Sequence, residues 1–131
     1  MAALRCLVVT PERTVLEAEA DFIALPLIDG EAGIAPNRGP LIGQLGYGEL
    51  RLTLNGASTR YYIDGGFVQV LQNVVSVLTQ RAQTVESIDA AAAREQLAAA
   101  MKKPISTPEL AELRERAILQ ARSLVRLAEK R

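Results

Sequence analysis

The sequence predicts a mainly β protein with a smaller α part: an N-terminal antiparallel β-sandwich, or flattened barrel, over residues 1–86, then an antiparallel two-helix hairpin over residues 87–131. Three observations predict this fold. Short apolar segments with period two fill the first part of the chain, and turn residues recur there about every ten positions. After Ser87 the sequence becomes alanine-rich, with apolar residues at helical spacing.

The strands of the predicted sandwich are indicated by apolar residues at alternate positions, as in the segments 4–8 and 50–54. The segment 22–28 is apolar throughout, so it is either a core strand or a strand whose outer face meets another protein. Pro26 favours an edge position for this strand because proline cannot donate to a neighbour. Cys6 lies in an alternating run, which predicts a small buried hydrophobe and not a nucleophile or half of a disulfide.

The predicted hairpin has recognisable helix starts. Ser87 and Asp89 supply a capping side chain and an acid before the first alanine-rich segment. Ser106 and Glu109 have capping-box spacing at the start of the second helix, and Pro108 is tolerated in a first turn. One apolar stripe follows this second helix, formed by Leu110, Leu113, Ala117, Ala121, Leu124 and Ala128.

Composition excludes several classes of function. The 131 residues contain no histidine and carry a net charge of zero. Neither a phosphate-binding loop, a nucleophile elbow nor a cluster with metal-ligand spacing is found, so catalysis and metal binding by this chain are not expected. No apolar run reaches the roughly 18 residues of a membrane span, and we expect no nucleic-acid binding because the sandwich part is acidic and poor in aromatics.

The zero net charge hides an asymmetry. Residues 1–86 carry six bases and nine acids, which gives −3, and residues 87–131 carry nine bases and six acids, which gives +3. This difference indicates two modules with different partners, or alternatively a helical tail with an ordinary solvated face.

The segment Asp29–Leu41 concentrates three glycines and two prolines between apolar strands. Glycine permits backbone angles that other residues avoid, and proline fixes its own torsion. The segment therefore predicts a loop of defined shape that makes contacts, with an ordinary sandwich loop as the alternative.

Two segments carry a resemblance to a known family. Residues 29–41 follow the pattern acid-Gly-x-x-Gly-Ile-x-Pro-x-(His/Arg)-x-Pro-Leu, and residues 61–70 followed by 73–78 look like a strand, a Gly-Gly turn and a closing hairpin. In this order and at this distance they resemble the epsilon subunit of F-type (rotary) ATP synthases, of the bacterial or chloroplast type. The resemblance covers essentially the whole chain.

The resemblance implies a non-catalytic rotor subunit of the central stalk, which couples ion translocation to ATP synthesis. The implied partners are the gamma subunit, the ion-carrying c-ring of the membrane and, through the hairpin, the catalytic alpha/beta head. The implied location is peripheral, on the cytoplasmic side of the bacterial plasma membrane. The residues that it implies for the interface with the ring and gamma are Glu31, Gly33, Pro36, Arg38 and Pro40.

Two features bear on how this chain would act within that family: the residue at position 38 and the cations of the hairpin. The family usually has histidine where Arg38 stands, so a permanent charge replaces a titratable ring. In the family the hairpin can also extend into the head and block ATP hydrolysis, and the candidate inhibitory contacts are the exposed cations Arg114, Arg116, Arg122 and Arg126. A solvated helix face is the alternative for these cations.

Some members of the family bind ATP through the pattern Ile-Asp-x-x-Arg-Ala. Here Ile88, Asp89 and Ala93 match, but Ala92 occupies the arginine position. Without that guanidinium we expect weak ATP binding or none, and no other cofactor. The residues alone also leave open a free-standing sandwich and hairpin that bind a small molecule, and a hydrolase that would need measurable turnover.

Overall fold

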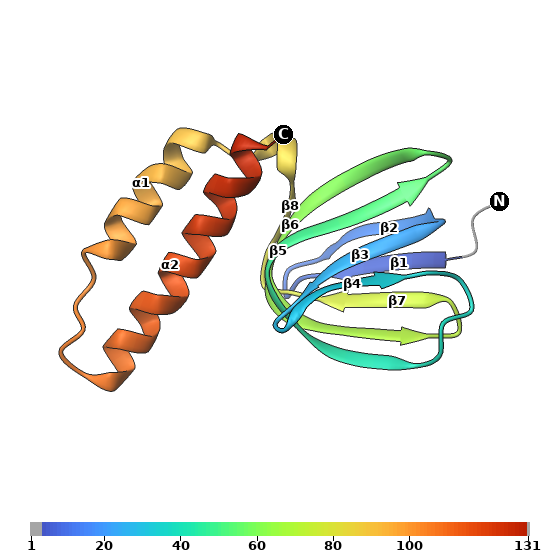
Figure 1. The fold of residues 1–131 in the computed structure, drawn as a ribbon, viewed down its shortest axis with the longest axis horizontal. Helices are drawn as coiled ribbons and strands as arrows, with labels where there is room; N and C mark the ends of the chain where they lie inside the picture. Colours follow the sequence, from blue (N-terminus) through green and yellow to red (C-terminus); the bar gives the residue numbers. More distant parts are fainter. Residues whose placement is uncertain (1–3, 131) are drawn as a thin grey trace. The chain divides into compact units, whose positions relative to one another are not determined.

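The computed structural model describes residues 4–130, and the chain forms two compact units, one up to Thr84 and one from Val85 onward (Figure 1). The first unit holds the strands and the second the helices. Within the described residues, the elements are β1 (Leu4–Val9), β2 (Thr14–Ala20), β3 (Phe22–Leu27), β4 (Gly30–Ile34), β5 (Leu41–Leu54), β6 (Ala57–Leu71), β7 (Val74–Leu78), β8 (Ala82–Thr84), a 3₁₀ turn η1 (Val85–Ser87), α1 (Ala90–Met101) and α2 (Pro108–Glu129).

The strands form one folded sheet in the order β2-β1-β7-β6-β5-β3-β4, with β8 paired to β6 outside this path. The mainly β sandwich followed by two helices is the predicted fold class, and it is confirmed. One pair departs from the predicted antiparallel arrangement: β1 and β7 pair in parallel, with Cys6 opposite Val75. A parallel pair needs a long crossover connection, and here β2 to β6 supply it.

Strand β6 is the element that joins the two layers of the sandwich. Its first half pairs with β8 at Tyr61–Ile63, and its second half pairs with β7 at Phe67–Leu71. Between them lie Gly65 and Gly66, with φ angles of +68° and +109°. The expected Gly-Gly turn is therefore a bend inside one continuous strand, because glycine adopts positive φ without breaking the pairing to β5.

The core of the sandwich consists of the alternate residues that face inward from both layers. Cys6 is fully buried, as predicted, and burial raises the pKa of its thiol to about 12. The largest buried side chains of this core are Ile23, Leu25, Ile34, Leu50, Ile63, Val8, Val68, Val70, Val75 and Val77.

Pro26 does not lie on an edge strand, which corrects the sequence prediction. Strand β3 lies between β5 and β4. Its register with β5 shifts between Ala24 and Leu27, so the ladder is interrupted where proline has no N–H to donate. A Cβ added to Gly48 would lie 3.0 Å from the Pro26 ring, so the glycine lets the two strands approach closely at this point.

The segment Asp29–Leu41 is not a loop throughout. Residues 30–34 form β4, an edge strand that pairs with β3. Ile34 lies opposite Ile23 at one end of this pairing, and Gly30 lies opposite Leu27 at the other. The connection to β5 is therefore shorter than expected and comprises residues 35–40.

The second unit contains two helices that lie side by side and run in opposite directions (Figure 1). Asp89, and not Ser87, caps α1: its carboxylate accepts the Ala92 N–H at 3.1 Å. Thr107, and not Ser106, caps α2, and its hydroxyl accepts the Leu110 N–H at 3.1 Å. Each cap moves the helix start by one or two residues from the sequence prediction.

The predicted stripe along α2 is only partly buried. Ala121, Leu124 and Ala128 are buried, whereas Leu113 remains 54% exposed. Ser123 and Leu127 are buried as well, so the buried surface is broader towards the C-terminal end of α2 than the stripe indicates. Among the described helices, none combines the length and apolar character needed to cross a membrane.

We expect Gly66→Ala to destabilise the sandwich by about 3 kcal/mol or more, because it combines backbone strain with overpacking. An added Cβ would lie 1.9 Å from the carbonyl oxygen of Leu78, at a φ of +109°. Gly56→Ala is the matched control: φ is +82° there, but nothing lies within 4 Å of the added Cβ. Urea unfolding of both variants measures the difference, and equal losses of stability would contradict a steric role for Gly66.

Candidate protein-docking site

Five large apolar side chains are exposed on strands β5, β6 and β7, and we call this set the β5–β7 face. Its members are Ile42, Phe67, Leu71, Val74 and Leu78, with exposed fractions between 38% and 79%. The intervening residues of β6 and β7, such as Val68 and Val77, point into the core. Pairing brings Phe67 next to Leu78 and Leu71 next to Val74, and the polar pair Gln69–Ser76, with Ile42 on the other side of Gln69, lies between these two apolar pairs.

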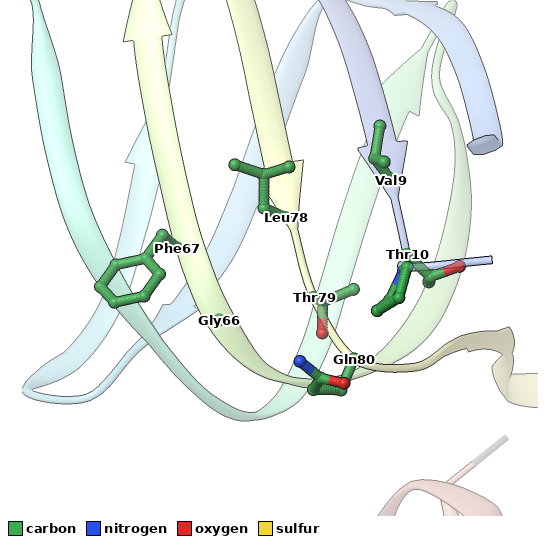
Figure 2. Close-up of a pocket in the computed structure, with 8 residues that line it drawn as sticks. Val9, Thr10, Gly66, Phe67, Leu78, Thr79 and Gln80 are labelled. Carbon is green, nitrogen blue, oxygen red and sulfur yellow. The ribbon is translucent and has the colours of Figure 1, made fainter. Parts of the chain in front are cut away.

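A shallow groove of about 340 Å³ lies at one end of the β5–β7 face. Figure 2 shows the side chains of Phe67, Leu78 and Val9, from three different strands, around it. Thr10, Thr79 and Gln80 also line the groove. An apolar side chain from another protein fits such a lining better than a polar ligand does.

The polar groups beside this groove are engaged within the sandwich. The Thr79 hydroxyl accepts the Asp64 N–H at 3.1 Å and donates to the Arg81 carbonyl at 3.3 Å. Tyr62 is fully buried and donates to Asp64 Oδ1 at 3.3 Å; burial, with the Asp64 charge as a further cause, raises the pKa of its phenol. These groups hold the bend of β6, and they leave an apolar surface for docking.

The residues implied for the ring and gamma interface fall at two ends of the sandwich. Glu31 and Gly33 lie on β4, and Glu31 is next to the β3–β4 turn. Pro36, Arg38 and Pro40 lie in the β4–β5 connection, at the other end of β4 (Figure 1). The rise along a strand puts roughly 13 Å between Glu31 and the start of this connection. The structure therefore does not bring the five residues together into one cluster.

The individual environments of these residues differ as well. Glu31 and Arg38 are exposed, and Arg38 Nη1 donates to the neighbouring Gly39 carbonyl at 3.3 Å. Gly33 has a packing role, because an added Cβ would lie 2.5 Å from the ring of Phe22. Glu31 and Arg38 are thus the two residues of this set whose charges reach solvent.

The second unit has its own groove, of about 520 Å³, formed by the end of α1, the α1–α2 connection and α2. Met101, Ile105 and Leu119 give it an apolar lining, and three charged residues, Arg114, Glu115 and Arg122, also line it. The Arg114 guanidinium donates to the Met101 carbonyl at 3.3 Å, which ties α2 to the end of α1. An apolar groove lined by two cations and one carboxylate suits a segment of another protein that carries both apolar and charged residues, with the excess positive charge favouring acidic ones.

The four candidate inhibitory arginines are not equivalent. At about 100° per residue, Arg122 lies roughly 80° around α2 from Arg114, whereas Arg116 lies roughly 200° away, on the opposite side. Arg116 approaches Glu112 at 3.7 Å, an exposed pair one turn apart. Arg126 is exposed in the last turn of α2.

The three residues that match the ATP pattern have local structural roles. The Asp89 carboxylate caps α1, while Ile88 and Ala93 are buried at 4% and 3% exposure. Ala92 donates its N–H to that carboxylate, so the position of the missing arginine belongs to the cap. Among residues 4–130, no group of three or more metal-ligating side chains is close enough to hold an ion.

Sequence reasoning missed the β5–β7 face. Residues 74–78 are apolar except for Ser76, and they were predicted only as part of a closing hairpin, with no indication of which face is exposed. A strand with one solvated face alternates apolar and polar residues, so a strand with apolar residues at most positions of both faces indicates either burial on both sides or a docking face. The sequence contained this signal, but the signal alone does not distinguish a buried strand from a docking face.

The fold and these surfaces define a class of protein: a β-sandwich with exposed apolar side chains on one face, followed by a two-helix hairpin. Comparison with known sequences agrees. Residues 3–85 match the family described as "ATP synthase, Delta/Epsilon chain, beta-sandwich domain". The chain is 51% identical to the ATP synthase epsilon chain of Rhodopirellula baltica over 124 residues, which cover 95% of this chain and 97% of that one.

Further comparisons point the same way. The epsilon chain of Symbiobacterium thermophilum is 42% identical over 96 residues, covering 72% of this chain and 69% of the relative. A chain of the Euglena gracilis mitochondrial ATP synthase structure (OSCP/F1/c-ring) has the same fold, with a TM-score of 0.84 at 23% identity over 95% of this chain and 80% of that one. The chain belongs to the ATP synthase delta/epsilon family, and it is thereby an epsilon-type subunit and not an enzyme by itself.

If Asp89 acts as a helix cap, Asp89→Ala should destabilise the helical unit by about 1 kcal/mol, while Asp89→Asn should retain most of the stability. The carboxylate accepts the Ala92 N–H, and an amide oxygen can replace it there. Amide hydrogen exchange at Ala92 measures the effect. A wild-type chain that ATP stabilises, together with an Asp89→Asn chain that it does not, would instead assign Asp89 to a nucleotide site.

Proposed function

We propose that this chain is the central-stalk epsilon subunit that couples ion translocation to ATP synthesis, with a docking sandwich (residues 1–86) and a regulatory hairpin (residues 87–131). The observation that carries the proposal is the β5–β7 face, where five large apolar side chains are exposed on neighbouring strands. Large apolar side chains gathered on one sheet face, here around the polar pair Gln69–Ser76, are typical of docking surfaces. The relatives named epsilon chain, and neighbours of the same fold from an F1/c-ring structure, support this role.

The gamma subunit is the partner that we assign to the β5–β7 face. An apolar face with a groove at one end suits a stable interface within a rotor, since permanent interfaces are more apolar than transient ones. The β4–β5 connection, with Pro36, Arg38 and Pro40, adjoins this face because Leu41 pairs with Val70 and begins directly after Pro40. It extends the same interface.

The c-ring is the partner that we assign to the opposite end, at the β3–β4 turn. Glu31 is exposed there on an edge strand. Gly33, on the same strand, leaves room for the Phe22 ring, which lies where a side chain at position 33 would be. The complex would sit on the cytoplasmic side of the bacterial plasma membrane, with this chain as a peripheral member.

The catalytic head is the partner that we assign to the hairpin. Arg114 and Arg122 flank the apolar groove of the second unit, and they are the two cations best suited to an acidic, apolar segment of the head. Arg116 and Arg126 would contribute at the rim, where exposed charges add little affinity.

The direct test is binding to recombinant gamma subunit. We expect Phe67→Ser and Leu78→Ser each to weaken binding by on the order of tenfold, as truncation of buried interface anchors does. Folding stability should change by less than about 0.5 to 1 kcal/mol, because both side chains are more than half exposed. Gln69→Ser is the matched control on the same face of β6. Calorimetry that gives equal affinities for all three variants would refute the assignment.

The regulatory part is tested by ATP hydrolysis of the reconstituted catalytic head and gamma subunit. We expect the full chain to slow hydrolysis and a chain ended at Glu86 to bind without slowing it. Arg114→Ala with Arg122→Ala should relieve the inhibition more than Arg116→Ala with Arg126→Ala, because the first pair stands at the groove. If the chain ended at Glu86 inhibits as strongly as the full chain, the hairpin is not the inhibitor.

A further inference from the structure

The β4–β5 connection is held by a residue that is distant in the sequence. The backbone N–H of Asn37 donates to Asn73 Oδ1 at 2.7 Å, and Asn73 Nδ2 donates to Asn37 Oδ1 at 3.3 Å. A backbone N–H can only donate, so the oxygen of the Asn73 amide must face it, and the nitrogen then faces Asn37 Oδ1. The two asparagines form a reciprocal pair between the connection and the β6–β7 turn.

Asn73 is itself well anchored. Its carbonyl accepts the Arg5 N–H at 2.9 Å, which ties the turn to β1. The turn closes a short hairpin in which Leu71 pairs with Val74. Asn37, in contrast, lies in an exposed connection between two prolines. The pair therefore joins a fixed turn to a segment that needs support.

Asparagine suits both ends of this pair. The φ angles are +65° at Asn37 and +66° at Asn73, a region that asparagine enters more readily than most residues. Its short side chain also offers one acceptor and two donors. Glycine would keep the backbone angle and lose the pair, and aspartate would keep the acceptor and lose the donor.

We propose that Asn73 is a positioning residue of the docking surface: by holding Asn37 it fixes the direction in which Arg38 leaves the sandwich towards the gamma subunit. The Arg38 side chain donates to the adjacent Gly39 carbonyl, a contact inside the connection that cannot orient the connection relative to the sheet. The Asn37–Asn73 pair supplies that orientation. The partner in this inference rests on the proposed function, whereas the contact itself does not.

The contact is tested first, on the free full-length chain, by NMR amide exchange at Asn37. Asn73→Gly should speed exchange about fivefold, the factor that a typical hydrogen bond provides. Asn73→Asp keeps the Oδ1 acceptor and should stay close to the wild type. Gln72→Gly is the matched control, since Gln72 has a positive φ of 51° in the same turn. Unchanged exchange in Asn73→Gly, or an equal increase in Gln72→Gly, would overturn the proposal.

The positioning role is tested next, by affinity for the gamma subunit in a double-mutant cycle. Asn73→Gly should lower affinity about fivefold in the wild-type background and have no further effect in an Arg38→Ala background, because it acts through Arg38. An equal loss in both backgrounds would overturn the role. If the wild-type chain does not bind gamma, the proposed function fails, and the Asn37 exchange rate still decides whether the pair holds the connection.

Discussion

The sandwich depends on the absence of a side chain at Gly66. The space that a Cβ would occupy there is taken by the carbonyl oxygen of Leu78, so β7 lies against β6 at a distance that no other residue allows. Immediately before this point β6 pairs with β8, and after it β6 pairs with β7. One strand thereby serves both layers, and the core residues of the two halves of β6, Ile63 and Val68, belong to a single cluster. The bend also sets the groove, since Gly66, Phe67 and Leu78 line it together.

Much of this fold was predictable because the periodicity of neighbouring residues indicates strands and helices. Alternation predicts β1 and the second half of β5, alanine content predicts α1, and the burial of Cys6 follows from its neighbours. The errors arise where a distant segment decides the outcome. Pro26 was assigned to an edge strand because proline has no N–H to donate to a neighbouring strand. The register between β3 and β5 shifts at this point, so no hydrogen bond from residue 26 is needed. The Gly65–Gly66 bend was assigned to a turn because the position of β8 cannot be inferred from glycines alone.

The candidate site was less predictable than the fold, for a related reason. Exposure depends on which face of a strand meets the second layer, and the run Val74–Leu78 is apolar on both faces. The motif residues gave position along the chain but not in space: Glu31 lies near the start of β4, whereas Arg38 lies in the connection that follows the other end of this strand. The Asn37–Asn73 pair has no sequence signal of its own, because it joins two turns through a contact that spans 36 residues.

The helical unit contains side-chain contacts that hold its two helices at their ends. Asp89 and Thr107 cap the two helices, and Arg114 binds the last carbonyl of α1. A helix of 12 residues such as α1 is marginal by itself, so its persistence depends on these caps and on packing with α2. Since the caps and the Arg114 contact lie within the unit, they persist if the unit changes its position within a larger assembly. The two caps thus stabilise the helices, and the Arg114 contact holds them to each other, through groups of the helical unit itself.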